Sequence, residues 1–206
     1  MQGQSMRTET KYKIYADFFR ASRKSGIARL IKSLFQQNYI GFNYIFTLRL
    51  HSDFHAKKRN IFERICFRLL VKNLKRLQIK YGIEIPHQAS IGEGLLIPHF
   101  GGIVIHPNVK IGKNCTILQG VTIGNNLFKS REDVATIGDN VTIAAGAKIV
   151  GPVTIGDNVT IGANSVVTSD IEPNCIVAGM PATIISRKES IVLNTDYLSF
   201  DEYQKR

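Results

Sequence analysis

The feature that most constrains the fold is a six-residue repeat of aliphatic residues in the second half of the chain. Between residues 85 and 167 only one isoleucine, Ile105, stands off this lattice. A short fixed period predicts a solenoid, in which each unit supplies one inward side chain and one corner, and three units close a coil of about 18 residues. The lattice positions are Ile85, Ile91, Ile97, Ile103, Ile111, Ile117, Ile123, Ile137, Ile143, Ile149, Ile155, Ile161 and Val167.

The repeat is interrupted twice, and after each interruption the six-residue spacing resumes. The step from Ile103 to Ile111 is eight residues, and the step from Ile123 to Ile137 is fourteen. Each is a multiple of six plus two, which predicts a bulge or a loop at a corner that leaves the stack intact. We expect chemistry near these insertions, because loops on a rigid scaffold often carry function.

Residues 10–80 have a different periodicity, typical of helices. Apolar and cationic side chains alternate there at spacings of three and four, and no proline interrupts them. Breaks are expected near Gly26, from Asn38 to Gly41 and from Ala56 to Asn60. The predicted organisation is a basic α-helical region (1–82), a β-helix domain (83–185) and a C-terminal tail (186–206).

The net charge of +11 is concentrated in the helical part. Residues 1–80 hold 18 Lys and Arg against four acidic residues, whereas residues 81–206 hold nine against 12. An anionic partner would therefore meet the first part. Contact of residues 1–80 with an anionic membrane is one hypothesis, and a purely structural role of these helices in assembly is the other.

Localisation follows from what the sequence lacks. No apolar run reaches the roughly 18 residues of a membrane span, and the three cysteines lie far apart, with no secretory signal ahead of them. We therefore expect a cytoplasmic protein, in a reducing compartment, which could reside at the inner face of a membrane. Nothing resembles a base-reading motif, so no nucleic-acid partner is expected.

Several segments resemble the hexapeptide-repeat acyltransferases. These are IEIPHQASIG, PHFGGIVI, CTILQGVTIG, IAAGAKIVG, IGANSVV and AGMPATIISRK, within residues 81–188. Inside that family they are most similar to serine acetyltransferases and their sugar-modifying relatives. The resemblance implies a mainly β protein, a left-handed parallel β-helix behind an α-helical N-terminal region. It also implies a homotrimer that binds acetyl-CoA in the groove between neighbouring solenoids.

The same resemblance assigns two catalytic residues. His99 occupies the place of the family's general base, which takes the acceptor's hydroxyl proton during acyl transfer. Glu84 stands where the family has an aspartate that orients this imidazole, although Glu is longer by one methylene. The alternatives are a corner histidine that only forms hydrogen bonds and a solvated surface carboxylate.

Gly124, Ala145 and Ala163 match the family's cofactor-binding positions, where small residues let the pantetheine approach the backbone. Two further cofactor residues are expected: Lys148, to contact the phosphates, and Gly179, in a segment that resembles the one closing the thioester end in the family. Ala145 and Ala163 lie 18 residues apart and are expected to stack on one edge of successive coils. Lys148 could instead be a solvated corner residue, and Gly179 could serve only a turn.

We predict no metal site. His51 and His55 have the four-residue spacing of metal ligands, but one pair without a third ligand is a poor site. His87 and His106, each beside a proline, are interpreted as solvated turn residues.

Three departures from the serine acetyltransferase pattern suggest a different acceptor. Pro98 replaces an aspartate that helps hold the amino acid, and Asp133 and Val134 replace an Arg-His pair that grips its carboxylate. A like charge at Asp133 disfavours a carboxylate-bearing acceptor. The first hypothesis is therefore an acetyl-CoA-dependent O-acetyltransferase acting on a sugar hydroxyl in capsular or extracellular polysaccharide synthesis. The alternatives are a serine O-acetyltransferase of cysteine biosynthesis and a non-enzymatic scaffold.

Overall fold

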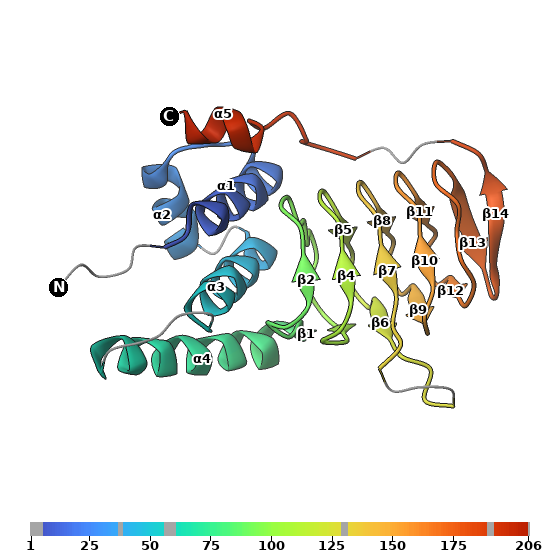
Figure 1. Cartoon of the computed structure of the whole chain (residues 1–206), viewed down its shortest axis with the longest axis horizontal. Helices are drawn as coiled ribbons and strands as arrows, with labels where there is room; N and C mark the ends of the chain where they lie inside the picture. Colours follow the sequence, from blue (N-terminus) through green and yellow to red (C-terminus); the bar gives the residue numbers. More distant parts are fainter. Residues whose placement is uncertain (1–5, 37–38, 56–60, 129–131, 189–191, 206) are drawn as a thin grey trace.

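The computed structural model describes residues 6–36, 39–55, 61–128, 132–188 and 192–205, and it shows a helical region at one end of a long β-helix (Figure 1). The helices are α1 (Thr8–Ser22), α2 (Ile27–Gln36), α3 (Ile40–His55) and α4 (Ile61–Tyr81), and a short α5 (Phe200–Gln204) ends the chain. The predicted break near Gly26 is confirmed, whereas Asn38 and residues 56–60 lie outside the described residues.

Gly41 was expected in a break but belongs to α3. The reason is packing, because a Cβ added at Gly41 would stand 1.9 Å from the carbonyl oxygen of Ile97. Only glycine lets α3 approach the β-helix this closely. Here glycine serves the contact between two elements and does not end the helix.

The β-helix consists of short strands that stack into three sheets. Sheet A has the order β1-β3-β6-β9-β12, sheet B the order β10-β7-β4-β2, and sheet C the order β14-β13-β11-β8-β5. All pairs are parallel except β13 with β14. The strands are β1 (Ile83–Glu84), β2 (Ser90–Ile91), β3 (Ile103–Ile105), β4 (Lys110–Ile111), β5 (Thr116–Ile117), β6 (Thr122–Gly124), β7 (Thr136–Ile137), β8 (Thr142–Ile143), β9 (Lys148–Val150), β10 (Thr154–Ile155), β11 (Thr160–Ile161), β12 (Val166–Val167), β13 (Ile176–Gly179) and β14 (Ala182–Ser186).

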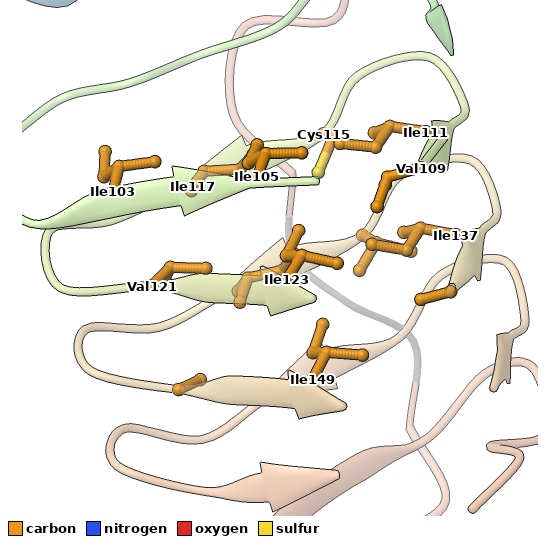
Figure 2. Packing of buried hydrophobic residues seen from close by; sticks show 14 of the residues in the cluster. Ile103, Ile105, Val109, Ile111, Cys115, Ile117, Val121, Ile123, Ile137 and Ile149 are labelled. Carbon is orange, nitrogen blue, oxygen red and sulfur yellow. The ribbon is translucent and has the colours of Figure 1, made fainter. Parts of the chain in front are cut away.

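The aliphatic lattice forms the core, as the period predicts. Every lattice residue is buried, with at most 6% of its surface exposed. Figure 2 shows Ile105, Ile123 and Ile149 in successive coils of sheet A, and the strand register pairs them directly. Ile105, which stands off the lattice in the sequence, therefore takes the stacked place expected of Ile103, and the eight-residue step lies between Ile97 and Ile105. Each buried aliphatic side chain contributes about 1.5–3 kcal/mol. The 18-residue coil is confirmed where Thr142 pairs with Thr160.

Two corners of the coil are built from stacked residues with positive φ. One column consists of Gly82, Gly102, Gly120, Gly146 and Asn164, and the other of Gly94, Asn114, Asn140, Asn158 and Asn174. Asparagine tolerates this left-handed conformation better than most residues. In the second column the side-chain amides also bond to one another along the axis, at 2.8–3.0 Å.

The C-terminal tail returns along the β-helix to the helical region (Figure 1). The Tyr197 hydroxyl donates to Asn114 Oδ1 at 2.6 Å and so caps the asparagine column. Arg20 of α1, almost fully buried, donates to the carbonyl of Leu193 at 3.1 Å. The ring of Tyr203 stacks on that of Tyr15, with 5.2 Å between centroids. These contacts hold the tail against α1.

A buried ion pair between α1 and α3 holds the helical region against the first coil. Arg49 of α3 donates to both carboxylate oxygens of Asp17 of α1, at 2.9 and 3.3 Å, and to the carbonyls of Ile91 and Gly92. Asp17 in turn accepts from the backbone N–H of Leu95 at 2.8 Å. Charged groups that are buried away from water need ion-pair and hydrogen-bond partners of this kind. The pair therefore ties α1, α3 and residues 91–95 together.

The asparagine column gives a direct test of what stabilises the stack. In Asn140→Ala, two side-chain hydrogen bonds are lost and alanine must adopt a φ of 58°, so we expect unfolding to become easier by about 2–4 kcal/mol. Asn140→Gly loses the same bonds without the strain, and should cost about 1 kcal/mol less. Denaturant unfolding of both variants measures the difference. Equal losses would show that the backbone conformation is not what asparagine supplies.

Candidate functional site

His99 lies at the corner of the first coil that leads into sheet A. It belongs to the turn between Ile97 and β3, and its side chain is exposed. Glu84 lies in β1, the outer strand of the same sheet, and its neighbour in the register is Val104 of β3. Gly82, two residues before Glu84, is stacked on Gly101 and Gly102, the residues that follow the His99 turn. The two predicted catalytic residues thus belong to segments that are neighbours at this corner, where Gly82 stacks on Gly101 and Gly102.

Neither side chain is engaged elsewhere. Among the described residues, no hydrogen bond or ion pair involves the imidazole of His99 or the carboxylate of Glu84, and none joins the two. Both are exposed and therefore accessible to a substrate. Catalytic hydrogen bonds commonly form only once substrate is bound, so this arrangement is compatible with a His99–Glu84 dyad.

A column of small residues rises from this corner along the β-helix axis. It is stacked by backbone hydrogen bonds, from Gly120 N–H to Gly101, from Gly146 N–H to Gln119 and from Asn164 N–H to Ala145, at 2.7–2.9 Å. Ala145 and Ala163 thus follow one another on a single edge, as their spacing predicts. Gly179 lies at the far end, where its N–H donates to Ser165 Oγ at 3.2 Å.

Lys148 and Gly124 are placed differently from these three. The Lys148 ammonium donates to the carbonyl of Gly120 at 2.5 Å and to Thr122 Oγ1 at 3.1 Å, so it braces its own sheet. Gly124 is the last residue of β6 and lies at the opposite end of the sheet A strands, where an added Cβ would meet no atom within 4 Å. Within one chain the five predicted cofactor residues therefore lie near two different corners of the coil.

The residues that depart from the family pattern are also split between two corners. Pro98 is exposed next to His99, whereas Asp133 and Val134 belong to the long insertion between β6 and β7. Val134 packs against the hydrophobic core, and Asp133 is exposed. The insertion is anchored by Asn108, whose side-chain amide donates to Glu132 Oε2 at 2.8 Å.

His87 is not the solvated turn residue that the sequence suggested. Its ring lies 4.6 Å from that of His51 and 4.3 Å from that of His55, between centroids, at the junction of α3 and the first coil. Burial, together with His55, lowers the pKa of His87. The described residues contain no group of three or more His, Cys, Asp or Glu side chains arranged to hold a metal ion.

Tyr44 is a buried residue beside the site that the sequence did not single out. Its hydroxyl donates to the carbonyl of Ile85 at 3.2 Å and accepts from the Ile85 N–H at 3.0 Å. Burial raises the pKa of Tyr44, so the hydroxyl stays neutral near pH 7. No local pattern distinguishes Tyr44 from the other aromatic residues of α3, so only the folded structure identifies it.

Comparison with known proteins agrees with this architecture. A family described as bacterial transferase hexapeptide (six repeats) matches residues 135–169, and hexapeptide repeat of succinyl-transferase matches residues 102–127. A serine acetyltransferase of Staphylococcus epidermidis is 35% identical over 167 residues, which cover 77% of this chain and 76% of the relative.

Solved structures give the same result. A serine acetyltransferase of Neisseria gonorrhoeae has a TM-score of 0.71 and 30% identity, covering 90% of this chain and 68% of the other. It has also been solved in complex with serine. A serine acetyltransferase of Brucella abortus, solved in complex with coenzyme A, has a TM-score of 0.68 and 27% identity, covering 89% and 68%.

The fold and the matched repeats define a hexapeptide-repeat transferase with a left-handed parallel β-helix. Within that class the chain belongs to the serine acetyltransferase family. It spans between 49% and 66% of the length of three other curated serine acetyltransferases.

The hypothesis of a polysaccharide O-acetyltransferase is contradicted, because these relatives, at 34–38% identity, are serine acetyltransferases. Differences at Pro98, Asp133 and Val134 did not justify another acceptor.

Proposed function

We propose that this protein transfers an acetyl group from acetyl-CoA to the hydroxyl of L-serine. The observation that carries the proposal is the exposed His99 at the foot of a small-residue column, in a chain 35% identical to a serine acetyltransferase over 77% of its length. Relatives solved with coenzyme A and with serine support the same pair of substrates. Free CoA and O-acetylserine are the products to measure.

The placement of the cofactor residues fits a site shared between subunits. Ala145, Ala163 and Gly179 lie at the corner between sheets C and A, and Gly124 lies at the opposite end of the sheet A strands, so one chain does not surround a ligand by itself. In a homotrimer, one edge of each subunit would face the opposite edge of its neighbour and form a groove. Small side chains there allow close approach to the backbone. Lys148 would shape this groove through Thr122 and Gly120.

In the proposed mechanism, acetyl-CoA supplies an acetyl thioester whose carbonyl carbon is open to attack. His99, in its neutral form, accepts the proton of the serine hydroxyl as the new C–O bond forms. Glu84 stabilises the positively charged imidazole that results. The proton then passes from His99 to the departing thiolate. The corner position keeps both side chains accessible, while rigid stacked strands limit their movement.

The base assignment predicts a large loss of activity in one histidine variant. His99→Ala should lower the rate of O-acetylserine formation by at least about 10²-fold, the usual contribution of a general base, without changing thermal stability. His55→Ala, on α3 and away from the corner, is the control. Glu84→Gln should cost about tenfold, because it keeps a polar side chain but removes the charge. Retention of a tenth of the activity in His99→Ala would exclude the assignment.

The acceptor carboxylate leads to a second prediction. Since Asp133 stands where the family has a carboxylate-binding arginine, serine should bind weakly. Asp133→Arg is expected to lower the KM for serine about tenfold, because a charge-assisted bond is worth at least about 1.5 kcal/mol. Asp133→Asn removes only the repulsion and should give a smaller decrease. An unchanged KM in both would place residue 133 outside the acceptor site.

We further propose that α2 contacts an anionic membrane surface. None of the described helices is both long and apolar enough to span a bilayer. On α2, however, Ile27, Ile31 and Phe35 form an exposed apolar stripe, beside the cationic Arg29 and Lys32. This combination is typical of an interfacial helix. Each cation near the surface adds about 1 kcal/mol.

Vesicle co-sedimentation tests the membrane contact. The protein should bind vesicles with anionic lipid, release them at high salt, and lose binding in Ile31→Asp. Ile79→Asp, on α4 and more exposed to solvent than Ile31 (78% against 48%), is the control. Equal affinity for neutral and anionic vesicles would contradict the proposal.

A further inference from the structure

The first coil of the β-helix has a neighbouring coil on one side only. β1, which carries Glu84, pairs with β3 and with no other strand among the described residues. An edge strand of two residues has few backbone bonds to hold it in place. The helical region covers this end of the solenoid, in the place that a preceding coil would occupy (Figure 1).

One helix, α3, supports both of the segments that carry the proposed dyad. The hydroxyl of Tyr44 bonds to both backbone groups of Ile85, the residue after Glu84. Gly41 touches Ile97, two residues before His99, so closely that a Cβ would overlap its carbonyl. Gly41 and Tyr44 are three residues apart and therefore lie on one face of α3. A helix is stiff over one turn, so the two contacts fix one segment relative to the other.

Both contacts are completely enclosed. Tyr44 and Ile85 have no exposed surface, and Ile97 has 3%. Water therefore cannot replace the hydroxyl, and the Ile85 backbone groups would lose their partner if it were removed. A second helix assists on the other side of His99, where the ring of Tyr81 at the end of α4 lies 5.6 Å from that of Phe100, between centroids.

We propose that Tyr44 is a positioning residue of the acetyl transfer, which holds the strand of Glu84 so that its carboxylate meets the imidazole of His99. This role rests on the proposed function. It assigns to the helical region a part in the chemistry that the β-helix alone does not provide. The hydroxyl acts through Glu84 and does not itself touch a substrate.

The test is a double-mutant cycle between Tyr44→Phe and Glu84→Gln. Tyr44→Phe alone should lower kcat about tenfold, as Glu84→Gln does, while the KM for acetyl-CoA changes by less than about twofold because the cofactor column belongs to later coils. In the Glu84→Gln background, Tyr44→Phe should cost less than about twofold. A merely structural role would reduce both backgrounds by the same factor.

A matched control and a direct readout complete the experiment. Tyr12→Phe removes another buried hydroxyl of the helical region, one that donates to the carbonyl of Leu198, and should leave kcat unchanged. Amide hydrogen exchange of residues 82–90 should accelerate in Tyr44→Phe and not in Tyr12→Phe. This measures the support of β1 without reference to activity.

The outcomes separate the two proposals. If the wild-type protein forms O-acetylserine but Tyr44→Phe keeps its full kcat, or if the cycle is additive, the positioning role is overturned and the proposed function stands. If the wild-type protein forms no O-acetylserine, the proposed function is overturned. The role of Tyr44 in the reaction is then overturned as well. Faster exchange of residues 82–90 together with a non-additive cycle supports the role.

Discussion

Each coil of this β-helix is held by the coil beside it, and this constraint determines most of the structure. Strands of two or three residues are too short to be stable alone, so they depend on parallel neighbours and on the aliphatic column inside. The corner residues with positive φ occupy the same position in each coil, because a different corner conformation would break the strand register. Stability is therefore transmitted from coil to coil, and the ends of the stack need other partners.

The N-terminal helices provide that partner at one end. Arg49, Asp17 and Arg20 are buried charged residues, and each is bonded to backbone groups of the first coils. Buried charges of this kind are costly unless they are fully paired, so they specify one arrangement of helices and coil. The returning tail adds Tyr197 to the same junction. The proposed catalytic corner lies in the first coil, where helices and solenoid meet.

Much of the fold could be predicted from the sequence, and less of the site. The period of six placed the inward residues from Ile85 to Val167, and the spacing of 18 stacked Ala145 on Ala163, because a solenoid converts sequence distance directly into position. His99 and Glu84 came from resemblance, and their catalytic roles stay a prediction, although the turn of His99 and strand β1 are neighbours in the first coil. The choice of acetyl acceptor cannot be predicted from the six-residue repeat, because it depends on individual side chains. The argument from Pro98, Asp133 and Val134 led to a sugar, whereas the relatives are serine acetyltransferases.

The sequence by itself determined the solenoid, its coil length, its longer interruption and the helical nature of residues before Gly82, since these depend on local periodicity. The shorter interruption was expected between Ile103 and Ile111, and the strand register places it between Ile97 and Ile105. Only the tertiary structure decided how the parts meet. It put Gly41 inside α3 against Ile97, brought His87 to His51 and His55, returned the tail to α1 and placed the Tyr44 hydroxyl on Ile85. Such contacts join residues distant in the chain, and they depend on the packing of surfaces that exist only after each element has formed.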